Sequence, residues 1–365
     1  MGNKVSVLMN TDKKKSILTS RKYMCKFPKI ELHRHLEGTF DPATLYSIAK
    51  KNGLDVPGDF EEFKTTIQFP REEEPDFLLF LSKFRTDWYA SHDDVEKIAY
   101  NSVYKMKEDG IFYIELRFSP EHFSLQNDFD RREITKLVID AGNKAAKDAG
   151  FHIRYLITFN RNKQTPEEMI SLYKMIKDLG IPEIVGIDLA GDEMNYPPEL
   201  FDSFFSQIQS DKLYKATVHA GEVTDSDQIW TAVTKLHAKR IGHGTSSIND
   251  PKLQEYLKEH FIVLEQCITS NYQTGSWKDE SNHPMGALHR NGVPVTINSD
   301  DPSIQNTDLT DDYIKAVTYF DFSLEDLVQL NLTALKATFL SGSKKQKLID
   351  EYASAVKRFR QFTGL

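Results

Sequence analysis

The stretch "KIELHRHL", residues 29–36, places two histidines among alternating apolar residues. This alternation is typical of a buried strand with a period of two residues. Because alternate side chains of a strand share a face, His33 and His35 are predicted to point to one side and Arg34 to the other. The rest of the chain indicates in which fold such a strand lies.

Seven further apolar runs follow, and segments of helical periodicity separate them. One such segment repeats Val95, Ile98, Ala99, Val103 and Met106 at helical spacing. Eight strands alternating with helices over about 250 residues predict an α/β fold, a (β/α)₈ TIM barrel. The seven runs are residues 112–119, 152–159, 184–190, 215–221, 240–244, 262–268 and 294–300.

Two departures from a minimal barrel are predicted. The segment from residue 39 to 111 is longer than one crossover helix needs, and it contains the apolar "PDFLLFLSKF" at residues 75–84. We therefore expect an inserted helical lid after the first strand. The run "DLVQLNLTALKATFL", residues 326–340, predicts extra helices after the eighth strand.

The composition argues against several classes of protein. A net charge of −8 over 365 residues disfavours nucleic-acid binding, which needs a basic face. Cys25 and Cys267 are too few for a disulfide framework, so a reducing compartment is expected. No apolar run approaches the roughly 20 residues of a membrane span. The sequence therefore predicts a cytoplasmic protein.

The first residues carry a separate signal. "MGNKVS" matches the myristoylation pattern, with Gly2 after the initiator Met and Ser6 in place. Basic residues dominate positions 4–29, and an acyl chain with a basic patch would tether a protein to an anionic membrane. The interpretation that we favour is a basic, flexible extension over residues 1–26, followed by one barrel domain over residues 27–365; the membrane tether is the alternative.

Polar residues gather where the predicted strands end, and in a barrel these ends form the active site. His33 and His35 end the first strand, His219 the fifth and Asp300 the eighth. Imidazole nitrogens and a carboxylate are ligands that zinc binds, with nitrogens at about 2.0–2.1 Å. Three histidines and one aspartate, with water completing the shell, predict an open catalytic site for one Zn²⁺ per chain.

Three further polar residues follow the same strand ends. Glu222, in "HAGE", is a candidate proton shuttle, because the intervening glycine lets it turn towards the same cavity as His219. His243, in "IGHGT", would orient or deprotonate a metal-activated water. Asp301 and Asp300 are adjacent carboxylates after a buried strand, an arrangement that is costly unless they find partners.

Six motifs, in this order, resemble the adenosine deaminase family. The resemblance covers the chain from about Phe27 to the C-terminus. It implies a zinc-dependent barrel that hydrolyses the 6-amino group of adenosine and 2′-deoxyadenosine, giving inosine or deoxyinosine and ammonia. The expected partner is thus a purine nucleoside. The motifs are "ELHRHLEG", "DLAGDE", "TVHAGEV", "RIGHGT", "SNYQTGSWK" and "NSDDP".

The resemblance also implies a role for each site residue. Glu222 is expected to protonate ring nitrogen 1, and His243 to orient the attacking hydroxide. Asp301 would read ring nitrogen 7 and Gly191 ring nitrogen 3, under a gate formed by the apolar insertion. The implied metal ligands are His33, His35, His219 and Asp300; the catalytic residues are Glu222, His243 and Asp300; the substrate-binding residues are His35, Glu37, Gly191 and Asp301.

One departure from the family leaves the substrate open. Adenosine-specific members usually carry Asp where this chain has Glu37, and that Asp contacts the ribose 5′-hydroxyl. The "HLEG" run also occurs in relatives that deaminate adenine or other 6-aminopurine derivatives, among which 5′-methylthioadenosine is an alternative. The motifs "DLAGDE", "IGHG" and "SNYQTGSWK" are closer to the nucleoside enzymes.

Two other classes of function are disfavoured. A binuclear amide or ester hydrolase would need a lysine at the end of the fourth strand, where this chain reads "GIDLAGDE". A membrane-tethered purine-binding protein without activity has no support, because every expected ligand and Glu222 are present. Seven other histidines are expected to be solvated or locally bonded: His92, His122, His152, His237, His260, His283 and His289.

Overall fold

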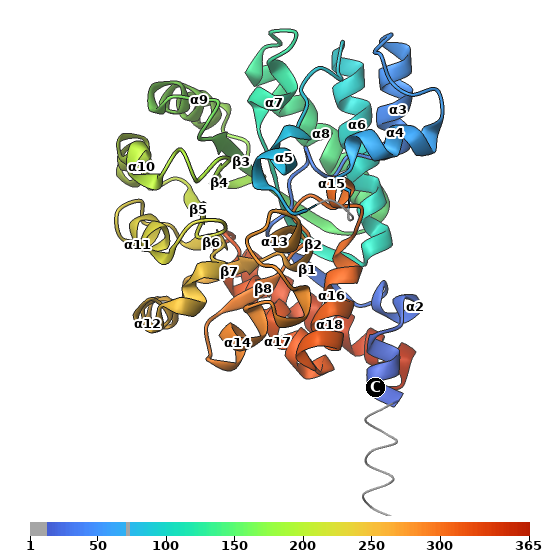
Figure 1. Ribbon diagram of the computed structural model, residues 1–365, viewed down its shortest axis with the longest axis vertical. Coiled ribbons are helices and arrows are strands. Elements are labelled where there is room, and N and C mark those ends of the chain that lie inside the picture. The colour runs from blue at the N-terminus through green and yellow to red at the C-terminus, as the bar shows by residue number, and fades with distance from the viewer. Residues whose placement is uncertain (1–12, 71–73) are drawn as a thin grey trace, which may run out of the picture.

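The computed structural model describes residues 13–70 and 74–365. Eight parallel strands form one sheet in which neighbours follow chain order, and helices surround it (Figure 1). The predicted (β/α)₈ barrel is confirmed. The strands are β1 Lys29–Glu31, β2 Ile111–Phe118, β3 His152–Asn160, β4 Ile184–Ala190, β5 Lys215–Ala220, β6 Arg240–His243, β7 Val263–Gln266 and β8 Val295–Ile297.

The ring closes where β1 and β8 meet, and both strands are only three residues long. A single bridge, between Arg34 and Asp300, joins the segments that follow them. The amide nitrogen of Asp300 donates to the carbonyl of His33 at 2.9 Å, and its carbonyl accepts from the amide of His35 at 3.0 Å. His33 and His35 therefore lie just beyond β1, in the seam of the barrel.

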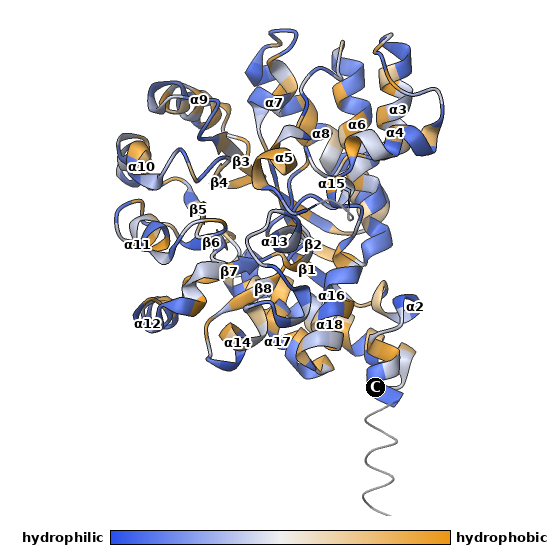
Figure 2. Ribbon diagram, viewed as in Figure 1, coloured by the Kyte–Doolittle hydropathy of each residue, from blue (hydrophilic) through white to orange (hydrophobic). Residues whose placement is uncertain are grey.

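Amphipathic helices cover the outside of the barrel. α9 begins at a capping box formed by Thr165 and Glu168, and it ends at Gly180, whose positive φ of 59° is easy for glycine. Hydrophobic and hydrophilic residues share each of these helices (Figure 2). The covering helices include α8 Arg131–Ala149, α9 Pro166–Leu179, α10 Asp202–Asp211, α11 Ser226–Thr234, α12 Pro251–Glu259 and α14 Met285–Arg290.

The insertion between β1 and β2 forms the predicted lid. α5 is mostly hydrophobic (Figure 2) and begins at Asp76, whose side chain accepts from the amide of Leu79 at 2.7 Å. Phe77 and Phe80 are buried, whereas Leu78 is exposed. The helices of this insertion are α3 Pro42–Lys51, α4 Phe60–Ile67, α5 Phe77–Ser82 and α6 His92–Lys105, followed by the 3₁₀ turn η1 Met106–Asp109.

The predicted extra helices after the eighth strand are also present. α17 contributes a buried side that faces β8 and β1, so it covers the seam. The C-terminal helices are α15 Pro302–Gln305, α16 Leu309–Phe320, α17 Leu324–Ala337 and α18 Gly342–Thr363. Short elements complete the loops at the strand ends: α7 Pro120–Ser124, η2 Pro198–Phe201, η3 Thr245–Asn249, α13 Ile268–Gln273 and η4 Glu280–Asn282.

Of the predicted N-terminal extension, residues 1–26, the structure describes residues 13–26, which include helical turns. α2 spans Arg21–Met24, and Leu18 and Met24 are buried. The buried ammonium of Lys29 donates to the carbonyls of Met24 at 2.6 Å and Asp109 at 2.7 Å. Because a buried cation needs acceptors, these bonds fix the segment to the barrel.

The predicted lipid at Gly2 lies outside the described residues. Within residues 13–70 and 74–365, no helix has both the length and the apolar character needed to cross a membrane.

Candidate active site

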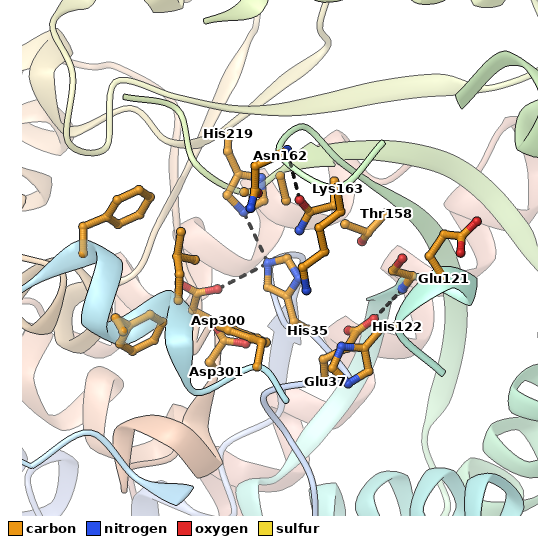
Figure 3. Close-up of a pocket in the computed structure, with 18 of the residues that line it drawn as sticks. His35, Glu37, Glu121, His122, Thr158, Asn162, Lys163, His219, Asp300 and Asp301 are labelled. Atoms are coloured by element: carbon orange, nitrogen blue, oxygen red, sulfur yellow. Dashed lines mark hydrogen bonds and ion pairs between the residues drawn. The ribbon is translucent and has the colours of Figure 1, made fainter. Parts of the chain in front are cut away.

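Four side chains that were predicted to bind a metal converge at the strand ends. Nε2 of His35 lies 3.2 Å from Nε2 of His219 and 3.5 Å from Oδ1 of Asp300. Figure 3 shows His35 between these two residues. Oδ1 of Asp300 is also 3.3 Å from Nε2 of His33. Tetrahedral ligands at about 2.0–2.1 Å from zinc lie roughly 3.3 Å apart, so these distances fit a zinc-sized ion.

The Nδ1 atoms of His33 and His219, on the side of each ring away from the other candidate ligands, also have the partners expected at a metal site. Nδ1 of His33 lies 2.8 Å from Oε2 of Glu265, and Nδ1 of His219 lies 3.0 Å from Oδ1 of Asp188. Metal-binding histidines usually donate their second ring nitrogen to such a carboxylate. Nε2 of His33 is buried and makes no hydrogen bond with the protein. These residues form a buried His/Asp site able to hold a metal ion.

An ionic network beneath the site joins the two carboxylates. Arg117 lies 2.8 Å from Glu265 and 3.3 Å from Asp188. Arg240 contacts Glu265 at 2.6 Å and Glu115 at 2.5 Å. All five side chains are fully buried, and each charge faces an opposite one, which is the condition for keeping ions in a protein interior. The network therefore fixes the rings that point at the metal site.

Glu222 and His243 face this site from the ends of β5 and β6. Nε2 of His243 lies 3.5 Å from Oε2 of Glu222 and 3.8 Å from Oδ2 of Asp300. Burial raises the pKa of Glu222 well above its usual value, and the nearby carboxylates of Asp300 and Glu193 raise this pKa further. A glutamate that keeps its proton near neutral pH can act as a general acid.

Asp301 points into the same cavity. Burial, and then the charge of Asp300, raise the pKa of Asp301 well above its usual value. Its Oδ1 atom makes no hydrogen bond with the protein. A Cβ atom at Gly38 would lie 1.9 Å from this oxygen, so only glycine leaves room for the carboxyl group.

The pocket continues from these groups to the lid. Phe77, Phe80, Leu81 and Phe84 line its apolar side, and Gly191 lies at the end of β4 with a φ of 101°. The remaining side is polar and includes Glu37, His122 and Lys163; Figure 3 shows Glu37 and His122 together, apart from His219. All the predicted site residues line this pocket except His33, which lies beneath His35 and His219.

Glu37 occupies the polar side as a buried carboxyl group. One of its oxygens accepts a hydrogen bond from the amide of Ser119, whereas Oε2 makes none. Burial raises the pKa of Glu37 to about 7, although the bond from Ser119 acts in the opposite direction. The free oxygen is thus available to a substrate group.

Comparison with known proteins agrees with this geometry. The family model described as "Adenosine deaminase" matches residues 28–355. An adenosine deaminase from Edwardsiella ictaluri is 33% identical over 336 residues, which cover 89% of this chain and 97% of the relative. The chain belongs to the adenosine deaminase family. This membership explains why the six motifs occur in order along one barrel.

Solved structures share the fold of this adenosine deaminase family member. An adenine deaminase from Arthrobacter aurescens superposes with a TM-score of 0.82 at 24% identity, covering 90% of this chain and 99% of that one. An amidohydrolase from Burkholderia ambifaria, solved with bound Zn, gives a TM-score of 0.85 at 23% identity and covers 95% of both chains. At these identities the likeness concerns the fold.

Several residues of this adenosine deaminase family member were not predicted to belong to the site. Asp188 and Glu265 lie inside strands, and their role depends on partners from other strands that no local pattern shows. His122 lines the pocket, and His283 contacts the site through Asn271, although both histidines were expected to be uninvolved. For His283, the available signal is its proximity to the motif "SNYQTGSWK"; for His122, it is the position shortly after the second predicted strand, residues 112–119.

Proposed function

We propose that this protein catalyses the zinc-dependent hydrolytic deamination of adenosine and 2′-deoxyadenosine, releasing ammonia. The observation that carries the proposal is the position of Glu222. This buried acid faces His243 and Asp300 across a cavity that also contains two imidazoles of the metal site. This arrangement supports a proton donor, Glu222, and a site for the attacking water that face the same substrate position.

His33, His35, His219 and Asp300 would hold the metal. Three nitrogen donors and one carboxylate suit zinc better than calcium or magnesium, which prefer oxygen ligands. When bound, zinc would lower the pKa of a water molecule towards about 7 and so provide a nucleophile at neutral pH.

The remaining residues would act on the purine. Burial raises the pKa of Asp301 and so favours its protonated form, which would donate a hydrogen bond to ring nitrogen 7, an acceptor. Glu222 would donate its proton to ring nitrogen 1, which makes carbon 6 more electrophilic. The oxygen of water then bonds to carbon 6, and the bond from carbon 6 to the amino group breaks. One proton of the water passes to the amino nitrogen, which leaves as ammonia, and the other proton restores Glu222. His243 would orient the attacking oxygen.

The lid and the polar side of the pocket favour a nucleoside. Phe80, Leu81 and Phe84 offer apolar contact that would exclude water around the reacting carbon. Beyond the base position the pocket continues past Glu37 to Lys163, which leaves room for a ribose. Free adenine would leave this polar side unoccupied.

The test is a comparison of four substrates by the ultraviolet change on deamination. Adenosine, 2′-deoxyadenosine, 5′-methylthioadenosine and adenine are assayed side by side, with and without a zinc chelator. We expect turnover of the first two, loss with chelator, and recovery when Zn²⁺ is restored. If the protein consumed adenine and left adenosine unchanged, the proposed deamination reaction would stand, but adenosine would be refuted as its substrate.

The proposal includes a cytoplasmic location, since Cys25 and Cys267 are both free thiols. If Gly2 is myristoylated, the protein would also associate with the membrane surface. Intact mass of the protein from its own cells decides between a modified and an unmodified Gly2.

A further inference from the structure

His243 also contacts residues outside the pocket. Asn271 and, beyond it, His283 form a chain of hydrogen bonds with the ring, and neither has a role in the proposed function. Nδ1 of His243 lies 3.0 Å from Nδ2 of Asn271, on α13. Oδ1 of the same amide lies 3.0 Å from Nε2 of His283, which follows η4. All three side chains are buried, so the contacts are shielded from water.

A backbone group sets the direction of this chain of hydrogen bonds. The amide of Met285 can only donate, and it donates to Nδ1 of His283 at 3.2 Å. Burial lowers the pKa of His283 to about 3, so the ring is neutral and its single proton lies on Nε2. That N–H donates to Oδ1 of Asn271. The amide nitrogen must then donate to Nδ1 of His243, which leaves the proton of His243 on Nε2.

Further hydrogen bonds fix the backbone of Asn271. The backbone nitrogen of Asn271 donates to the carbonyl of Cys267 at 2.9 Å. The carbonyl of Asn271 accepts from the amide of Trp277 at 2.8 Å and from the hydroxyl of Ser276 at 3.0 Å. The motif "SNYQTGSWK" thus folds back on its own asparagine and fixes it beneath His243.

The same reasoning gives the opposite tautomer for two neighbouring histidines. His33, His219 and His243 have ring nitrogens within 4.8 Å of one another, and on distance alone all three would be metal ligands. Glu265 and Asp188 accept from Nδ1 of His33 and His219, which leaves Nε2 of each ring with a free lone pair. In His243 that position carries hydrogen, and a nitrogen that carries hydrogen cannot bind a metal.

We propose that Asn271 and His283 are positioning residues that hold His243 as its Nε2–H tautomer. In this form His243 stays outside the metal shell and donates a hydrogen bond to the attacking oxygen. While neutral, it cannot take a proton from water at Nε2. The inference rests on the proposed function for the identity of that oxygen, whereas the tautomer itself rests only on the contacts above.

NMR spectroscopy of the wild-type, zinc-loaded protein determines the tautomer of His243 directly. Long-range ¹H–¹⁵N correlation of ¹⁵N-histidine-labelled protein distinguishes protonated from bare ring nitrogens, and H243Q and H283Q identify the two rings. We expect a bare Nδ1 and a protonated Nε2 in both His243 and His283. A protonated Nδ1 in His243 overturns the proposal whatever the enzyme acts on.

The kinetic test replaces the amide by an isosteric carboxylate. In Asn271→Asp the side chain still accepts from His283 but no longer donates, so Nδ1 of His243 would take the proton and Nε2 would lose it. A wrong histidine tautomer costs up to about 10⁴-fold in kcat in a well-studied triad, and we expect a loss of at least about 100-fold here. KM should change less than about threefold, because the lost bond forms in the transition state. Zinc content should stay at one per chain.

A second pair of variants covers the case that Asn271→Asp folds poorly. In His283→Gln the side-chain amide can donate in place of Nε2–H, whereas His283→Leu cannot. We expect turnover to be at least about tenfold higher in the Gln variant than in the Leu variant. His260→Leu, a change at the exposed histidine that directly follows α12, is the matched control.

The outcomes separate the two proposals. If the wild type leaves adenosine unchanged, the proposed function fails, and the NMR result still decides the tautomer. If the wild type is active and Asn271→Asp or His283→Leu keeps turnover within threefold of it, the positioning role is refuted.

Discussion

Nδ1 of His33 and Oε2 of Glu265 lie 2.8 Å apart in the fully buried interior of the barrel. The same carboxylate contacts Arg117 and Arg240, so one glutamate both orients a metal-site histidine and balances two cations. Its loss should therefore affect metal binding and stability together.

Glu265→Gln tests this coupling. Loss of a carboxylate behind a metal-binding histidine typically weakens metal affinity 10- to 100-fold. Breaking a buried ion pair costs about 3–5 kcal/mol of unfolding free energy. We expect both effects, measured by competition with a zinc chelator and by urea unfolding.

The matched control for Glu265→Gln is Glu115→Gln. Glu115 pairs with Arg240 at 2.5 Å but contacts none of the site histidines. The control should lose stability and keep zinc affinity. Equal loss of zinc in both variants would contradict the orienting role of Glu265.

Glu222→Gln should remove the proton donor and leave the pocket intact. The amide has nearly the same shape but cannot transfer a proton, so kcat should fall by about 10²–10⁴-fold, with one zinc per chain retained. Steady-state kinetics with adenosine and metal analysis check this. Ordinary turnover in the variant would exclude Glu222 as the acid.

Gly38→Ala should disturb the purine site through Asp301. The new Cβ would lie 1.9 Å from Oδ1 of Asp301, so the carboxyl group must move. A displacement of about 1 Å at a reacting group can cost on the order of 100-fold, and we expect kcat/KM to fall by roughly 10- to 100-fold. Gly58→Ala, where a Cβ meets no atom within 4 Å, is the control and should be unaffected.

Glu37 should give a pH dependence close to neutrality. Its pKa is raised to about 7, so the carboxylate forms only above that pH. If the ionised form binds the 5′-hydroxyl, kcat/KM for adenosine should fall with decreasing pH below about 7 and level off above it. Glu37→Gln should remove this limb and lower the plateau by about tenfold or more. If kcat/KM of the Glu37→Gln variant still falls below pH 7, the pH dependence belongs to another titrating group.

The same carboxyl group should link stability to pH. Its pKa is about 7 in the folded protein and 4.5 in the reference state, so the folded form holds a proton that the unfolded chain releases between these values. Its contribution is present below about pH 4.5 and is lost as pH rises to about 7, at about 1.4 kcal/mol per unit. The difference between wild type and Glu37→Gln in urea unfolding at pH 5 and pH 7 measures this loss.

The sequence allowed prediction of those parts of the site that depend on local order. The eight strands have runs of apolar residues, and the predicted ligands stand near the carboxyl ends of those runs. Once the barrel is assumed, the ends of different strands must meet at one face, and this is why His219 and Asp300 could be placed near His35.

The contacts that cross the barrel could not be predicted in this way. Glu265 reads as an interior strand residue in "VLEQ", and its partners Arg117 and Arg240 come from two other strands. Burying a charge is favourable only when an opposite charge arrives from elsewhere, and that condition concerns the fold as a whole. The segment before β1 depends in the same way on Lys29, whose buried ammonium donates both to Met24 and to Asp109, which is distant in the sequence.

The candidate metal site lies at the seam between β1 and β8, so binding of a metal there would also stabilise the closure of the barrel. Among the described strands, every other neighbouring pair is held by a ladder of backbone bonds, whereas here the backbone bonds run through His33, His35 and Asp300. These residues would hold the proposed metal ion and they also complete the ring. Metal loss and opening of the barrel wall are thus expected to be one event, and the apoprotein should exchange its amide hydrogens fastest along this line.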